Sequence, residues 1–69
     1  MNIRVECEQE TDGRWIAEVT ELPGVLAYGS NPEEATAKVK ALALRVIAER
    51  LEGGESTEDL SVISFNVAA

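Results

Sequence analysis

The 69-residue sequence has no histidine and only one cysteine. Zinc sites are built mostly from cysteine and histidine, and general acid–base catalysis most often uses histidine. A single cysteine also excludes an intramolecular disulfide. The composition therefore argues against a zinc cage, a disulfide-stapled scaffold and a histidine-dependent enzyme.

The few remaining reactive side chains lack partners. The serines have no triad partner, and Cys7 alternates with apolar residues that should face inward, so we expect a small buried side chain with a structural role. The acidic residues show no fixed metal-ligand spacing, and the glycines form no phosphate-binding motif. We therefore expect no enzymatic activity, no cofactor and no metal site.

Basic residues are also few, six against thirteen acidic residues, for a net charge of −7. This balance would repel DNA and RNA and attract a basic protein, although it could also serve solubility alone. No apolar run approaches the ~20 residues of a membrane span, and the start of the chain lacks the apolar region of a signal peptide. A single unpaired cysteine is ordinary in the reducing cytoplasm. Together these features predict a cytoplasmic protein that binds neither membranes nor nucleic acid directly.

Three short segments alternate apolar and polar side chains, the pattern of half-buried strands. They are residues 2–9, 14–20 and 25–28. Asp12-Gly13 is a hairpin signal between the first two segments, and Pro23-Gly24 suits a type II turn before the third. Because both connections are short, the three strands should form an antiparallel meander.

A helix is predicted from Asn31 to about Glu52. Asn31 suits the N-cap, Pro32 fits the first helical position, and Glu34 can complete a capping box. Capping explains the acidic pair Glu33 and Glu34 better than catalysis or metal binding does. The Gly-Gly pair that follows should end the helix.

Residues 60–68 alternate again and predict a fourth strand. A right-handed crossover through the helix would place this strand parallel to the first strand and beside it. We therefore predict one α+β domain over residues 1–69, with element order βββαβ. Its four-stranded mixed sheet should have strand order 3-2-1-4, with the helix on one face.

The helix carries more apolar side chains than one core stripe requires. The predicted stripe and the residues that widen it are Ala35, Val39, Leu42 and Val46, and then Ala43, Ile47 and Leu51. Leu44 lies on the far side of the helix. A domain of this size is marginally stable alone, so we expect a homodimer or higher oligomer. The candidate interface positions are Ile16, Leu26, Leu44, Ile47, Leu51 and Val62.

Residues 12–35, DGRWIAEVTELPGVLAYGSNPEEA, resemble the HicB family of antitoxins and HicB-like proteins. The family pattern has a hairpin glycine, an aromatic residue, Ala-x-Val-Pro-x-Leu-Pro-Gly, a further glycine and Glu-Glu-Ala at a helix start. The matching residues are Gly13, Trp15, 17–24, Gly29 and 33–35, with Thr20 where the family commonly has proline. The resemblance covers residues 2–52 well and the last strand more loosely.

The resemblance implies a partial ribonuclease-H-like fold without that fold's catalytic carboxylates. It also implies a role as an antitoxin, which binds a small basic RNA-cleaving toxin (HicA) and blocks its active site. Many family members carry a further C-terminal domain for operator DNA, and we expect no DNA binding from residues 1–69. The alternative is a toxin-free homo-oligomeric binding or scaffold protein. Glu6, Glu18 and Glu21 are the acidic positions that alternation makes candidates for partner binding.

Overall fold

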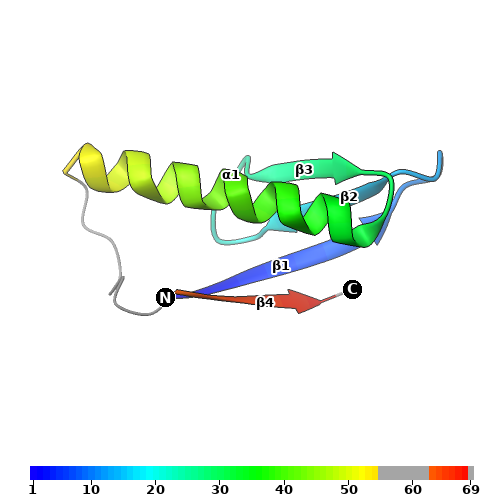
Figure 1. Cartoon of the computed structure of the whole chain (residues 1–69), viewed down its shortest axis with the longest axis horizontal. Helices are drawn as coiled ribbons and strands as arrows, with labels where there is room; N and C mark the ends of the chain where they lie inside the picture. Colours follow the sequence, from blue (N-terminus) through cyan, green and yellow to red (C-terminus); the bar gives the residue numbers. More distant parts are fainter. Residues whose placement is uncertain (55–62, 69) are drawn as a thin grey trace.

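A computed structural model describes residues 1–54 and 63–68 and folds them into one sheet with a helix across it (Figure 1). The chain order is β1 (Asn2–Gln9), β2 (Trp15–Val19), β3 (Leu26–Gly29), α1 (Pro32–Glu52) and β4 (Ser64–Ala68). The sheet order is β3-β2-β1-β4. This architecture confirms the predicted α+β fold and its 3-2-1-4 topology.

The strand pairings follow from the connections. β1 and β2 pair antiparallel, as do β2 and β3, whereas β4 runs parallel to β1. β1 has the predicted bounds, β2 and β3 differ from the predicted ranges by one residue at each end, and Ile63, predicted to belong to the fourth strand, precedes β4. In particular, Val25 belongs to the turn, because its backbone N–H donates to the carbonyl of Leu22. Residues 60–62 of the predicted fourth strand, including the candidate Val62, lie outside the described residues.

The start of α1 is capped largely as its sequence predicts. The Asn31 side-chain oxygen accepts a hydrogen bond of 2.8 Å from the backbone N–H of Glu34. The Glu34 carboxylate accepts from the backbone N–H and hydroxyl of Ser30, one residue before the cap, and from the Lys38 ammonium. The Lys38 contact, followed by those from Ser30, lowers the pKa of Glu34 below its usual value. These hydrogen bonds hold the first turn of α1 close to the end of β3.

The core lies between α1 and one face of the sheet. Its buried apolar side chains are Ile3, Val5, Ala17, Val19, Leu22, Val25, Ala35, Val39, Ala43 and Ile47. On the helix these residues recur every fourth position, and Leu42 and Val46 lie only at the edge of the core. The buried stripe is therefore rotated from the predicted one. Small side chains at Ala35 and Ala43 let the helix approach the sheet closely.

The C-terminal part of α1 extends beyond the ends of the strands (Figure 1). Leu51, predicted to widen the core face, is consequently 54% exposed. Leu44 lies on the far side of the helix, as predicted, and is 44% exposed. Two leucines of α1 thus remain on the surface of this chain.

Candidate functional site

The sheet face turned away from α1 combines acidic and apolar side chains. We call six residues of this surface the outer sheet face: Glu6, Glu8, Ile16, Glu18, Leu26 and Tyr28. Arg4 lies on the same side of β1, two residues before Glu6. Pairing between strands places the six residues in two rows across β1, β2 and β3: Glu6 is opposite Glu18, which is opposite Leu26, and Glu8 is opposite Ile16, which is opposite Tyr28. The acidic half therefore lies mainly on β1 and the apolar half mainly on β3.

The opposition of Glu6 and Glu18 is electrostatically unfavourable. Like charges directly opposite each other on neighbouring strands destabilise a sheet. Within residues 1–54 and 63–68, neither carboxylate forms an ion pair. The negative charge of this row is therefore left for the solvent or for a cationic partner to neutralise.

Glu21, the third acidic residue predicted to bind a partner, forms hydrogen bonds within the chain. Its carboxylate accepts a hydrogen bond from the Thr20 hydroxyl at 2.9 Å and one from the backbone N–H of Arg4 at 3.2 Å. The Thr20 hydrogen bond is the main cause of a lowered pKa at Glu21. The structure thus brings Glu6 and Glu18 together and places Glu21 beside the first residues of β1.

The apolar half of the outer sheet face contains an aromatic ring, Tyr28, that is not among the residues predicted from the sequence. Leu26 and Tyr28 are 37% and 39% exposed, and the Arg14 guanidinium lies 4.5 Å from the centre of the Tyr28 ring. Arg14 also pairs with Asp12 at 2.8 Å. The signal for Tyr28 was the period-two alternation, which places it with Leu26. Aromatic and arginine side chains are enriched at protein-binding surfaces.

The candidate oligomer residues lie on two different surfaces. Ile16 and Leu26 belong to the outer sheet face, whereas Leu44 and Leu51 lie on the exposed side of α1. Ile47 is only 5% exposed, because its side chain fills the core between helix and sheet. It therefore contributes to the core of this chain rather than to an exposed interface.

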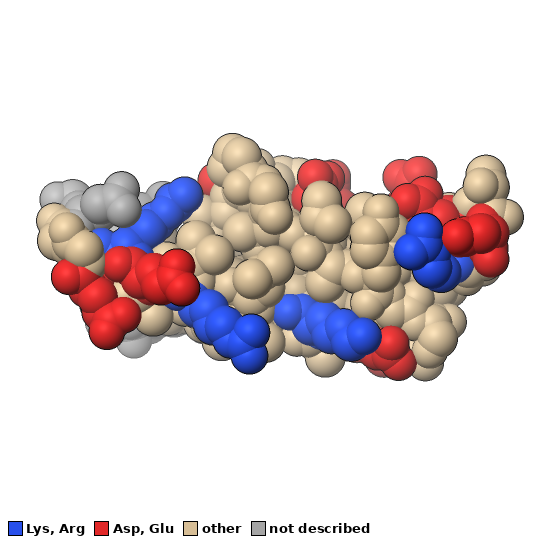
Figure 2. Space-filling view, turned by 90° about the horizontal axis from the view of Figure 1, so that it is seen from above, with Lys and Arg blue, Asp and Glu red and all other residues tan. Residues whose placement is uncertain are grey.

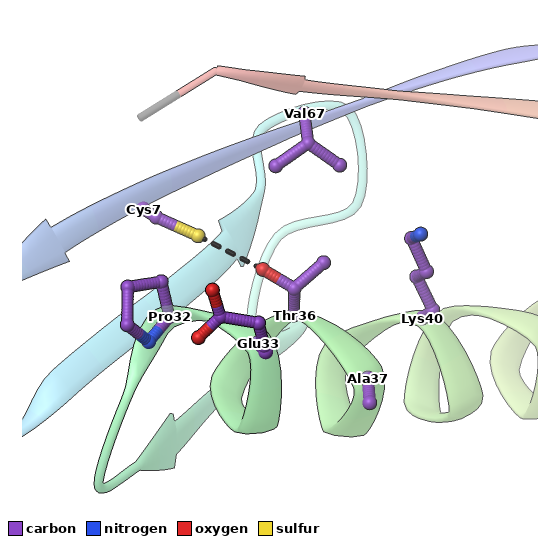
Figure 3. Close-up of a pocket in the computed structure, with 7 residues that line it drawn as sticks. All are labelled: Cys7, Pro32, Glu33, Thr36, Ala37, Lys40 and Val67. Atoms are coloured by element: carbon purple, nitrogen blue, oxygen red, sulfur yellow. Dashed lines mark hydrogen bonds between the residues drawn. The ribbon is translucent and has the colours of Figure 1, made fainter.

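A pocket of about 410 Å³ opens on the helix side of the sheet, where α1 diverges from β1 and β4 (Figure 3). Its lining residues are Cys7, Pro32, Glu33, Thr36, Ala37, Lys40 and Val67. Because α1 packs mainly on β3 and β2, Cys7 is half-buried at this opening rather than fully buried as predicted.

The chemistry of this pocket is limited. The Cys7 sulfur lies 3.1 Å from the Thr36 hydroxyl, which is not a base, and Lys40 is turned toward the Phe65 ring at 5.5 Å. Across the described parts of the chain, no three histidine, cysteine, aspartate or glutamate side chains gather as metal ligands do. The arrangement offers neither an activated nucleophile nor a cation site.

Replacing Cys7 by alanine is expected to lower the free energy of unfolding by about 1 kcal/mol, because a half-buried sulfur is lost and the pocket grows slightly. Urea titration followed by circular dichroism measures this change. Partner binding should survive, since Cys7 faces the helix side of the sheet. A folded Cys7→Ala protein that no longer binds its partner would contradict a purely structural role.

Within the described residues, no helix is long and apolar enough to span a membrane. Comparisons with protein-family models, with curated proteins and with solved structures find no match to this chain. The evidence for a function therefore comes from the structure itself. Glu6 and Glu18 have no ion-pair partner among the described residues, and they lie beside the exposed Leu26 and Tyr28.

Proposed function

We propose that this protein is a HicB-like antitoxin that binds a small basic RNA-cleaving toxin of the HicA type and blocks its active site. The observation that carries the proposal is the cross-strand pair of Glu6 and Glu18, which has no cationic partner in the described part of the chain. A basic surface that contacts this pair relieves an electrostatic cost of the free protein. From the same resemblance we also propose that the fold is a partial ribonuclease-H-like fold.

The two halves of the outer sheet face have different tasks in this mechanism. The acidic half, together with the net charge of −7, attracts a basic partner and raises its association rate. The apolar half, with Leu26 and Tyr28, excludes water from the centre of the contact and slows dissociation. The toxin is inhibited because its RNA-binding surface is covered, and no bond is made or broken.

The test is co-expression with any small basic protein that the adjacent reading frame encodes. We expect rescue of growth and a complex that weakens as the salt concentration rises. In the purified complex, the double variant Glu6→Gln/Glu18→Gln should lower the association rate about tenfold at low salt. Its fold should be at least as stable as that of the native protein, because the variant removes two opposed like charges.

The matched control is Glu33→Gln/Glu49→Gln, which removes the same amount of charge from exposed positions of α1. We expect this control to bind at close to the native rate. Equal losses in both double variants would mean that net charge alone acts, and that the outer sheet face is not the contact surface.

A toxin-free homo-oligomeric binding or scaffold protein is the second candidate function. The exposed Leu44 and Leu51 on α1 favour it, because exposed apolar clusters commonly mark interfaces. The absence of a basic neighbour, of rescue and of a complex, combined with a stable oligomer, would favour this second function over toxin blockade.

A further inference from the structure

The exposed side of α1 carries a second apolar stripe, separate from the core stripe. We call it the outer helix seam, and its residues are Ala37, Ala41, Leu44, Ala48 and Leu51. All five are exposed, and their spacing is four, three, four and three residues. This is the repeat of a coiled-coil contact, in which apolar residues recur on average every 3.5 positions.

The outer helix seam points away from the sheet. At 3.6 residues per turn, its centre lies about 140° around the helix from the buried stripe of Ala35, Val39, Ala43 and Ile47. A second helix can therefore lie along the seam without meeting the sheet. A partner docked there would have its own sheet on the far side.

Charge along the seam favours one direction for that helix. Lys38 and Arg45 flank its N-terminal and central parts, after the acidic Glu33 and Glu34 of the first turn. Glu49 and Glu52 flank its C-terminal part, where the last turn also carries Arg50. In Figure 2, basic side chains lie along the middle of the molecule, and acidic side chains lie at both of its ends. An antiparallel copy of α1 would place basic positions beside acidic ones, whereas a parallel copy would place like charges together.

Side-chain size along the seam also fits an antiparallel copy. In an antiparallel copy, Leu44 would face the partner's Ala48, and Leu51 would face the partner's Ala41. With the two-fold-related copies of these pairs there are four layers, and each sets a large residue against a small one. Alternating large and small residues allow facing layers to interdigitate. In this register Lys38, which bonds Glu34 of its own helix at 3.2 Å, lies near the partner's Glu52.

We propose that a second copy of this chain docks on the outer helix seam, antiparallel and with two-fold symmetry. The resulting homodimer has a sheet–helix–helix–sheet arrangement. It buries Leu44 and Leu51, which the single chain leaves 44% and 54% exposed. The outer sheet face stays open, so this dimer does not depend on the proposed toxin blockade and is compatible with it.

Analytical ultracentrifugation of the full chain tests the dimer. We expect a concentration-dependent dimer, and we expect Leu44→Lys to raise its dissociation constant by roughly a hundredfold, because two buried leucines are lost per dimer. The matched control is Leu26→Lys, the same change at a similarly exposed leucine of the outer sheet face. The control should leave the dimer intact, and circular dichroism should show both variants folded.

Charge reversal tests the orientation. Lys38→Glu and Glu52→Lys should each weaken the dimer, and the double variant should recover most of the loss. In a Cys7→Ala background, a mixture of Ala41→Cys and Leu51→Cys proteins should form mixed disulfides in preference to either homodimer disulfide.

Three results would overturn the proposal. They are a monomer at high micromolar concentration, a dimer broken by Leu26→Lys but not by Leu44→Lys, and preferential homodimer disulfides between identical positions. A chain that is monomeric alone but binds a different protein through Leu44 would likewise assign the seam to another partner.

Discussion

Replacing Gly29 by alanine is expected to lower the free energy of unfolding by about 3 kcal/mol, because an added methyl group has no room. A Cβ atom at Gly29 would lie 2.5 Å from the backbone nitrogen of Ala35 and 3.0 Å from its Cα. These are backbone atoms in the first turn of α1, so no side-chain rotation relieves the overlap. The helix would have to move away from β3 and open the core beneath Ala35.

Gly24→Ala is the matched control for this prediction. Gly24 has a φ of 85°, and a Cβ atom there would meet nothing within 4 Å. Its replacement therefore costs only the strain of a left-handed backbone, about 1 kcal/mol. Urea titration of the three proteins should rank them native, Gly24→Ala and Gly29→Ala in decreasing stability. A Gly29→Ala protein as stable as the native one would mean that α1 does not pack this closely on β3.

Replacing Val39 by aspartate is expected to unfold most of the protein at neutral pH. Val39 is fully buried between α1 and the sheet, and the described residues contain no buried polar or charged side chain that could pair with a new carboxylate. An unpaired buried charge costs at least about 4 kcal/mol. A 69-residue domain has a total stability of only about 3–10 kcal/mol.

The control is Leu44→Asp on the exposed side of the same helix. It introduces the same residue type and loses more helix propensity, since leucine is a better helix former than valine, but its carboxylate stays in water. Measured at a dilution where self-association does not contribute, Leu44→Asp should keep its native circular dichroism spectrum while Val39→Asp loses it. Two equally folded variants would mean that the buried side of α1 has been assigned to the wrong residues.

Together these two substitutions test the contacts on which the candidate surfaces depend. The close approach at Gly29 sets the position of α1 over β3 and β2. The burial of Val39 sets the rotation of α1, and that rotation turns Leu44 toward the solvent. Among the described residues nothing covers the outer sheet face, because the helix lies on the opposite side of the sheet (Figure 1).

The sequence by itself determined the features that depend on neighbouring residues. Alternation over residues 2–9 predicted β1 with its observed bounds, and Asn31 and Pro32 predicted the start of α1. Short turns and the right-handed crossover then left one simple sheet order, which the structure confirms. These signals were sufficient because strand alternation, turn formation and helix capping involve residues a few positions apart.

Only the tertiary structure decided which of the many apolar side chains of α1 are buried. Periodicity identified a broad apolar region but not its rotation against the sheet, and so Ile47 entered the core while Leu51 stayed exposed. Alternation likewise placed Glu6 and Glu18 on faces of their strands, but the β1–β2 register set them opposite each other. Helix rotation and strand register depend on contacts between residues far apart in the chain, which local patterns do not specify.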